Sequence, residues 1–162
     1  MPDMLIKLYD LDDEWCFIAE QKLHGVAIRK PIGPEKHLLV EWVADHFSPG
    51  WAAETDVAAA NTPRSCFTAV KASKFIGFAC YDATALGYFG PTGVEKSERG
   101  KGIGQALLRA CLLDMKLKGY GYAIVGDVKD PEYYKKVVGA IDIPDSSPGV
   151  YENRVKNTDP NH

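Results

Sequence analysis

The sequence lacks the features that would bind nucleic acid or cross a membrane. Its 162 residues contain no block of lysine and arginine long enough to follow a phosphodiester backbone, and the formal net charge is −3. Nucleic acid is therefore not an expected partner. No apolar stretch approaches the ~20 residues that a membrane span needs. The N-terminus MPDMLIKLYDL also lacks the pattern of a secretory signal. We therefore expect a cytoplasmic protein with no membrane partner.

The usual patterns of disulfide and metal sites are also missing. Cys16, Cys66, Cys80 and Cys111 are scattered among apolar neighbours without a paired CxxC spacing, so we expect reduced thiols in the core. The four histidines show no H-E-x-x-H or similar ligand spacing. We therefore expect no metal site.

The hydrophobic residues that are present suffice for one core. They make up 46% of the chain, which suits a single domain at this length. The chain shows no internal repeat and no low-complexity segment. We expect residues 1–156 to form one domain and residues 157–162 to form a frayed C-terminal tail.

Changes in hydrophobic period predict a mixture of strands and helices. The expected strands cover residues 4–11, 66–70, 75–83, about 86–96 and 122–128, with final strands in IDIP and GVYENRV. The expected helices cover residues 34–47, 51–61, 103–118 and 131–140. Residues 12–33 fit either a strand or a helix, and their structure stays open.

The segment ERGKGIG, residues 98–104, has the composition of an anion-binding loop before a helix. Its glycines allow backbone N–H groups to approach an anion, and the helix N-terminus adds unpaired N–H groups and a positive dipole end. The Walker pattern is excluded because Lys101 is followed by glycine, and the glycine spacing does not fit a dinucleotide loop. The alternative is a glycine turn that packs a helix closely on a sheet.

Read as R-x-x-G-x-G after a strand ending in Gly93-Val94-Glu95, this segment resembles the pyrophosphate loop of the GNAT superfamily of N-acetyltransferases. Downstream, YAIVGDV resembles that family's next strand, and PEYYKKVVGA resembles its F-Y-x-K-x-G helix. The resemblance covers about residues 67–140. It implies an α/β (α+β) fold with a mixed, mostly antiparallel central sheet flanked by helices. In that fold a splayed pair of strands forms the CoA cleft.

The resemblance also implies the reaction and the cofactor site. An amine acceptor would attack acetyl-CoA directly in a ternary complex. Pantetheine would bind backbone groups from Thr92 to Val94, and the N–H near Val94 would polarise the thioester carbonyl. The pyrophosphate would bind the loop residues, which are Arg99, Gly100, Lys101, Gly102, Ile103 and Gly104.

Tyr134 is the general acid that the resemblance implies for the departing CoA sulfur, because it stands at the second position of the F-Y pair. Four residues separate Tyr134 from Gly139, one more than in the commonest family pattern, and Ala140 replaces the usual phenylalanine. The register of this helix is therefore open. Tyr133 remains the alternative acid.

The acceptor side carries fewer sequence signals. The family's frequent carboxylate on the strand before the loop is missing from residues 86–89, which read LGYF. Glu54 is the candidate base, because it lies where the family's first helices cover the acceptor site. Its alternative is a solvated helix carboxylate. Trp51 is either a wall of the acceptor pocket or a core aromatic.

Two functions are compatible with these patterns. The first is an acetyl-CoA-dependent N-acetyltransferase acting on a small-molecule or peptide amine. The alternative is a CoA-binding module or sensor without transfer activity, which the missing strand carboxylate makes plausible. The sequence leaves the acceptor and the oligomeric state open, and a homodimer is compatible with it.

Overall fold

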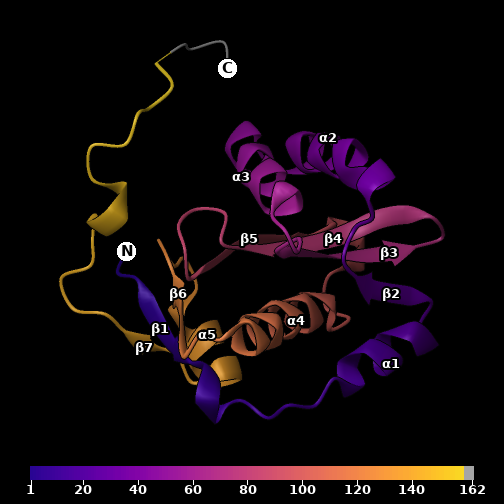
Figure 1. Cartoon of the computed structure of the whole chain (residues 1–162), viewed down its shortest axis with the longest axis horizontal. Coiled ribbons are helices and arrows are strands. Elements are labelled where there is room, and N and C mark those ends of the chain that lie inside the picture. The colour runs from indigo at the N-terminus through magenta and orange to yellow at the C-terminus, as the bar shows by residue number, and fades with distance from the viewer. Residues whose placement is uncertain (159–162) are drawn as a thin grey trace.

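A seven-stranded sheet in the order β2-β3-β4-β5-β6-β1-β7 divides the protein into two helical layers (Figure 1). The computed structural model describes residues 1–158, so part of the expected tail, residues 159–162, lies outside the described residues. The strands are β1 (Met4–Lys7), β2 (Val26–Arg29), β3 (Cys66–Lys71), β4 (Lys74–Tyr81), β5 (Tyr88–Val94), β6 (Tyr122–Val125) and β7 (Ile141–Asp142). The helices are α1 (Cys16–Leu23), α2 (Lys36–His46), α3 (Pro49–Ala60), α4 (Ile103–Lys118) and α5 (Pro131–Val138).

The expected mixed, mostly antiparallel sheet is confirmed. β5 and β6 pair in parallel, whereas the other neighbouring strands pair antiparallel. The parallel pairing joins Tyr88 to Ile124 and Phe89 to Val125, and it stops there. β5 then continues along β4 to Val94, while β6 ends at Val125. The two strands therefore diverge after Phe89.

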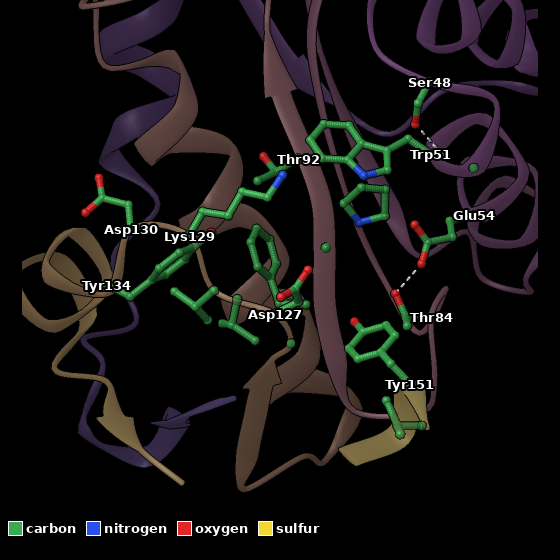
Figure 2. Close-up of a pocket in the computed structure, with 18 of the residues that line it drawn as sticks. Ser48, Trp51, Glu54, Thr84, Thr92, Asp127, Lys129, Asp130, Tyr134 and Tyr151 are labelled. Carbon is green, nitrogen blue, oxygen red and sulfur yellow. Dashed lines mark hydrogen bonds between the residues drawn. The ribbon is translucent and has the colours of Figure 1, made fainter. Parts of the chain in front are cut away.

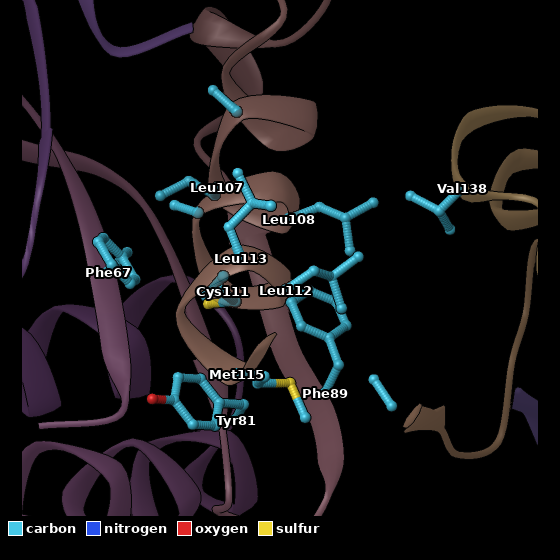
Figure 3. Close-up of a cluster of buried hydrophobic side chains, with 14 of the residues drawn as sticks. Phe67, Tyr81, Phe89, Leu107, Leu108, Cys111, Leu112, Leu113, Met115 and Val138 are labelled. Atoms are coloured by element: carbon cyan, nitrogen blue, oxygen red, sulfur yellow. The ribbon is translucent and has the colours of Figure 1, made fainter. Parts of the chain in front are cut away.

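The helices cover both faces of the sheet. α2 and α3 lie on one face, and α1 and α4 lie on the other (Figure 1). α4 presents an almost continuous apolar surface because leucines recur along its length, and Leu107, Leu108 and Leu112 are fully or almost fully buried. Figure 3 shows these side chains between the sheet residues Phe67 and Phe89. This packing fixes the N-terminus of α4 against the end of β5.

A second hydrophobic cluster lies under α2 and α3. It joins buried residues of these helices, such as Leu39 and Val43, to Phe78 of β4. Trp51 packs at its border, with ring centroids 5.3 Å from Phe47 and 6.1 Å from Phe78. This cluster holds α3 over β4 and β5.

Some element boundaries differ from the sequence expectations. The open segment contains α1 and β2, and β2 pairs with β3. The first strand is shorter than expected, because residues 8–10 form a 3-10 turn. The prediction of a strand in GVYENRV is wrong: Gly149–Tyr151 forms a 3-10 turn, η4, and residues 152–158 contain no strand. Within residues 1–158, no helix combines the length and apolar character that a membrane span requires.

Candidate active site

The divergence of β5 from β6 exposes a backbone edge. Glu95 donates its N–H to the Ile76 carbonyl of β4, over 2.9 Å. Successive residues of a strand point their backbone groups to opposite edges, so those of Val94 and Thr92 point away from β4. They face the space that β6 has left. An extended ligand can pair with this edge as an additional strand would.

A cavity of about 750 Å³ lies at this edge and brings several expected residues together. Trp51 and Glu54 line it from α3, and Thr92 lines it from β5. Tyr133 and Tyr134 line it from α5. We call it the main cavity. Figure 2 shows Glu54 and Tyr134 on opposite sides of it. The expected base and the expected acid therefore belong to one site, with the open strand edge beside them.

The glycine loop, residues 98–104, lies at the far end of the same edge. The Arg99 guanidinium donates from Nε to the Val94 carbonyl, over 3.0 Å. Two residues before Val94, Thr92 lines the main cavity. One strand edge thus connects the loop to the cavity.

The backbone of the loop suits an anion. Gly100 and Gly102 have φ angles of +79° and +80°, which favour glycine. The first backbone hydrogen bond at the start of α4 runs from Ala106 N–H to the Gly102 carbonyl. The N–H groups of residues 103–105 precede it and have no acceptor within the helix. Gly100 and Gly102 are exposed, so a pyrophosphate could reach this backbone.

The charged side chains of the loop are engaged in local contacts. Lys101 forms an ion pair with Glu98, with Nζ 2.9 Å from Oε2, and Lys71 approaches the same carboxylate at 3.4 Å. The contact with Lys101 lowers the pKa of Glu98. The Arg99 side chain donates its hydrogen bond to the Val94 carbonyl. In this structure the anion-binding capacity of the loop therefore lies mainly in its backbone.

A residue of α1 contacts the glycine loop. Gln21 is 8% exposed, and its Nε2 donates to the Lys101 carbonyl over 3.2 Å. This contact holds one carbonyl of the loop on the side of α1. The sequence patterns did not identify Gln21, because it lies in the segment whose structure they left open.

Capping of α3 explains why Trp51 and Glu54 share a face. The Ser48 hydroxyl accepts a hydrogen bond from Trp51 N–H over 3.1 Å, and Pro49 occupies the first turn. The helix therefore begins just before Trp51. Glu54 follows three residues later and lies on the same side of the helix. Trp51 borders the second hydrophobic cluster and also lines the main cavity, so its position is compatible with both interpretations.

A threonine from the β4–β5 connection holds Glu54. The Thr84 hydroxyl donates to Oε1 of Glu54. The other carboxylate oxygen has no hydrogen-bond donor assigned to it among residues 1–158. Glu54 is partly buried, and its assignment as the base stays a prediction. One oxygen is fixed, and the other can accept a proton.

The connection that carries Thr84 is itself rigid because of Asp82. This carboxylate is 5% exposed and accepts hydrogen bonds from Gly87 N–H, over 2.7 Å, and from the Tyr120 hydroxyl, over 2.9 Å. Lys118 pairs with it at 2.9 Å. Sequence reasoning missed Thr84 and Asp82, because only the tertiary structure brings them to α3 and α4.

The two tyrosines of α5 are both partly buried and pack against the hydrophobic core. Asp130 caps the helix by accepting a hydrogen bond from Tyr133 N–H, and Gly139 ends it with a φ of +65°. Burial raises the pKa of Tyr134 to about 12. Burial also raises the pKa of Tyr133, with a further contribution from Asp130. Both hydroxyls therefore stay protonated at neutral pH, as a general acid must.

Within residues 1–158, no group of three histidine, cysteine or acidic residues is arranged to hold a metal ion. A carboxylate, a protonated tyrosine and an exposed strand edge surround one cavity, and a loop suited to phosphate lies at the other end of that edge.

Comparisons with known proteins agree with this geometry. Residues 35–139 match the model of the acetyltransferase (GNAT) family. No curated protein matches the chain. A GCN5-related glucosamine N-acetyltransferase region of a fungal multi-domain GH3 β-N-acetylglucosaminidase superposes with a TM-score of 0.70 at 16% identity. That match covers 88% of this chain and 19% of the fungal one.

Two bacterial structures are also similar in fold. A GCN5-related N-acetyltransferase from Sphaerobacter thermophilus has a TM-score of 0.63 at 21% identity, covering 88% of this chain and 48% of that one. A GNAT family acetyltransferase from Brucella melitensis, in complex with acetyl-CoA, has a TM-score of 0.53 at 18% identity, covering 75% of this chain and 92% of that one. This chain thus spans about a fifth of the fungal protein and about half of the Sphaerobacter protein. Because the family match covers well over half of its residues, the chain belongs to the GNAT family of acetyltransferases.

Proposed function

We propose that this protein is an N-acetyltransferase that moves the acetyl group of acetyl-CoA to an amine by direct attack in a ternary complex. The observation that carries the proposal is the open edge of β5, which leads from the glycine loop to a cavity lined by both Glu54 and Tyr134. Membership of the GNAT family supports the same donor. We assign residues 1–156 to the acetyltransferase domain.

The donor would bind along the strand edge. The amides of pantetheine would pair with backbone groups of Thr92 and Val94, which point away from β4. The pyrophosphate would then reach the backbone N–H groups of Arg99 to Gly104 and the positive end of the α4 dipole. A backbone N–H near Val94, at the end of this edge that lines the cavity, would donate to the thioester oxygen, where negative charge develops during attack. Acetyl-CoA supplies the activated acetyl group.

Glu54 would prepare the acceptor. A primary amine with a pKa near ~10.4 is almost wholly protonated at neutral pH, and the ammonium form has no lone pair for attack. The free oxygen of Glu54 accepts this proton, directly or through a water molecule, while Thr84 keeps the carboxylate in place. The amine nitrogen then attacks the thioester carbon. Trp51 forms the wall beside it.

Tyr134 would assist the departure of CoA. As the carbon–sulfur bond breaks, the electron pair of that bond goes to sulfur. The Tyr134 hydroxyl donates a proton to the thiolate, while the acylated nitrogen loses its extra proton to solvent and Glu54 releases the proton that it took from the ammonium ion. The products are the N-acetyl amide and free CoA thiol. The tyrosinate regains a proton from solvent. Tyr133 stays the alternative donor because both tyrosines line the cavity.

The test is release of free CoA thiol from acetyl-CoA in the presence of glucosamine, kanamycin, spermidine or an alanyl peptide with a free N-terminus. We expect release that depends on at least one of these amines, which cover four acceptor classes. Binding of acetyl-CoA without amine-dependent release would contradict the proposal and favour a CoA-binding sensor. The fold itself does not select the acceptor.

A substitution at Glu54 tests the base. We expect Glu54→Gln to lower kcat/KM for the amine about 10²-fold or more at neutral pH, because the amide keeps the shape but cannot take the proton. The deficit should shrink as the pH rises toward the pKa of the amine, since free amine then comes from solution. The measurement is the pH profile of kcat/KM for both proteins.

Asp56→Asn on the same helix is the matched control. Asp56 is exposed, and its ion pair with Lys36 contributes little at a surface. This variant should keep the wild-type profile. If Glu54→Gln also transfers acetyl groups at the wild-type rate at every pH, then Glu54 is not the base.

The proposal includes a cytoplasmic location. Its support is the state of the cysteines, which are all free, with Cys66, Cys80 and Cys111 buried. Free thiols suit a reducing compartment. A homodimer stays compatible with the proposal.

A further inference from the structure

The C-terminal segment, residues 149–154, reaches the acceptor side of the main cavity. Val150, Tyr151 and Arg154 line it, although they lie far from α3 and α5 in the sequence. Tyr151 belongs to the turn η4 and is partly buried. Figure 2 shows its hydroxyl directed into the cavity, between Asp127 on one side and Glu54 with Thr84 on the other. The cavity wall at this point therefore comes from a part of the chain that the family match does not include.

Contacts with the N-terminus hold the residues that lead into this segment. Asp3 is 5% exposed, and its N–H donates to the Ser146 hydroxyl over 2.7 Å. Its carbonyl accepts a hydrogen bond from Ile143 N–H over 2.8 Å. Its carboxylate accepts one from Asp127 N–H over 3.2 Å. One buried residue thus ties residues 143–146, which lead into the C-terminal segment, to the residues just after β6.

Gly126 leaves the space that Tyr151 occupies. A Cβ atom at Gly126 would lie 2.6 Å from the Tyr151 hydroxyl oxygen and 3.2 Å from a ring carbon of Tyr88. Such close contact would require Tyr151 to move. The end of β6 is therefore shaped to admit this tyrosine.

The Tyr151 hydroxyl keeps its proton at neutral pH. Burial, followed by the negative charge of Glu54, raises its pKa to about 12. A protonated phenol can donate one hydrogen bond and accept others. No hydrogen bond of this hydroxyl to another residue is assigned within residues 1–158. Its hydrogen-bonding capacity is thus available to a ligand in the cavity.

We propose that Tyr151 is an acceptor-binding residue, whose hydroxyl oxygen accepts a hydrogen bond from a cationic primary amine that lies between Glu54 and Asp127. The inference rests on the proposed acetyl transfer and extends it by assigning a side of the acceptor site to the C-terminal segment. Two carboxylates and a phenol oxygen form a set of acceptors that matches the N–H groups of an ammonium ion. The proton then passes to Glu54 before attack.

The test is steady-state kinetics of Tyr151→Phe with whichever of glucosamine, kanamycin, spermidine and the alanyl peptide the wild-type protein acetylates fastest. This change removes one oxygen atom and keeps the ring beside Gly126. We expect KM for the amine to rise about tenfold, which is typical for a lost hydrogen bond to a charged group. KM for acetyl-CoA should stay unchanged. Tyr122→Phe, at an exposed tyrosine outside the cavity, should leave both KM values unchanged.

Gly126→Ala provides a second variant that acts through the same hydroxyl. It should also raise KM for the amine, because the new methyl group displaces Tyr151. An unchanged amine KM in a folded Tyr151→Phe protein overturns the inference and leaves the proposed function intact. A rise in the acetyl-CoA KM equal to that for the amine also overturns it, since that result indicates a general structural role. Absence of amine-dependent transfer in the wild-type protein overturns both proposals.

Discussion

Tyr134→Phe should lower kcat by about 10²–10⁴-fold, the usual contribution of a positioned general acid. The variant loses only the hydroxyl, so its ring still packs against Phe89, with centroids 6.5 Å apart. The dissociation constant of acetyl-CoA should change little. The CoA thiolate must then leave without a proton donor, and the barrier rises in the chemical step alone. Single-turnover rates of thiol release, measured with saturating amine, test this expectation.

Tyr133→Phe is the matched variant, because it removes the same atom from the neighbouring side chain of the same helix. Its kcat should fall far less. If Tyr133→Phe instead shows the larger loss, the extra residue before Gly139 has shifted the register, and Tyr133 is the acid. If both variants keep full kcat while chemistry limits the rate, the thiolate leaves without a tyrosine acid.

Gly102→Val should raise the dissociation constant of acetyl-CoA by about 30-fold or more. At its φ of +80° a side chain is strained, by ~1–2 kcal/mol even without a branched Cβ. The new Cβ would also lie 3.4 Å from Nε2 of Gln21, which already holds the Lys101 carbonyl. The loop relieves this strain by moving, and its N–H groups then lose their alignment with the pyrophosphate. Titration calorimetry with acetyl-CoA measures the effect.

Gly121→Val is the control for replacing a glycine by valine. Gly121 lies just before β6, with an ordinary φ and no atom within 4 Å of an added Cβ. The affinity of the Gly121→Val protein for acetyl-CoA should equal that of the wild-type protein. Circular dichroism must show that both variants are folded. An unchanged affinity in folded Gly102→Val protein would remove the assignment of the glycine loop to pyrophosphate.

Local patterns predicted the elements whose signals lie within a short stretch. α4 follows an apolar period that ends at Gly119, and the structure gives this helix as Ile103–Lys118. The β3–β4 hairpin also follows from two apolar runs around a short turn. Such patterns depend on neighbouring residues, so the sequence contains them in full.

Elements that depend on distant partners could not be predicted in the same way. α1 is a short helix of eight residues with a weakly amphipathic sequence, so its period did not separate helix from strand. The prediction of a strand in GVYENRV was wrong because β-forming residues need a sheet edge to pair with. This segment instead begins with a 3-10 turn at Gly149, whose φ is +57°.

The residues of the candidate site also differ in whether a short sequence motif marks them. The glycine loop and the tyrosine pair were visible as short motifs. Thr84 and Tyr151 were not, because single hydroxyl residues in a turn carry no spacing signal. Their roles appear only when the fold brings residues 54, 84 and 151 around one cavity.

The cysteines of the chain do not supply a nucleophile for a covalent acetyl-enzyme in the main cavity. A covalent acetyl-enzyme requires a nucleophile in the cavity, and none of the four cysteines lines it. Burial raises the pKa of Cys66 to about 12, which keeps that thiol protonated. Ser48 lines the cavity, but its oxygen caps α3. The proposed direct attack in a ternary complex requires both substrates to be bound before transfer.

Direct attack in a ternary complex is tested most directly by the initial rate of CoA thiol release, measured while the concentrations of acetyl-CoA and of the accepted amine are varied together. We predict double-reciprocal lines that intersect, because acetyl transfer takes place in a ternary complex. Parallel lines, with exchange of the acetyl group between acetyl-CoA and labelled CoA in the absence of amine, would contradict direct attack and require an acetylated residue.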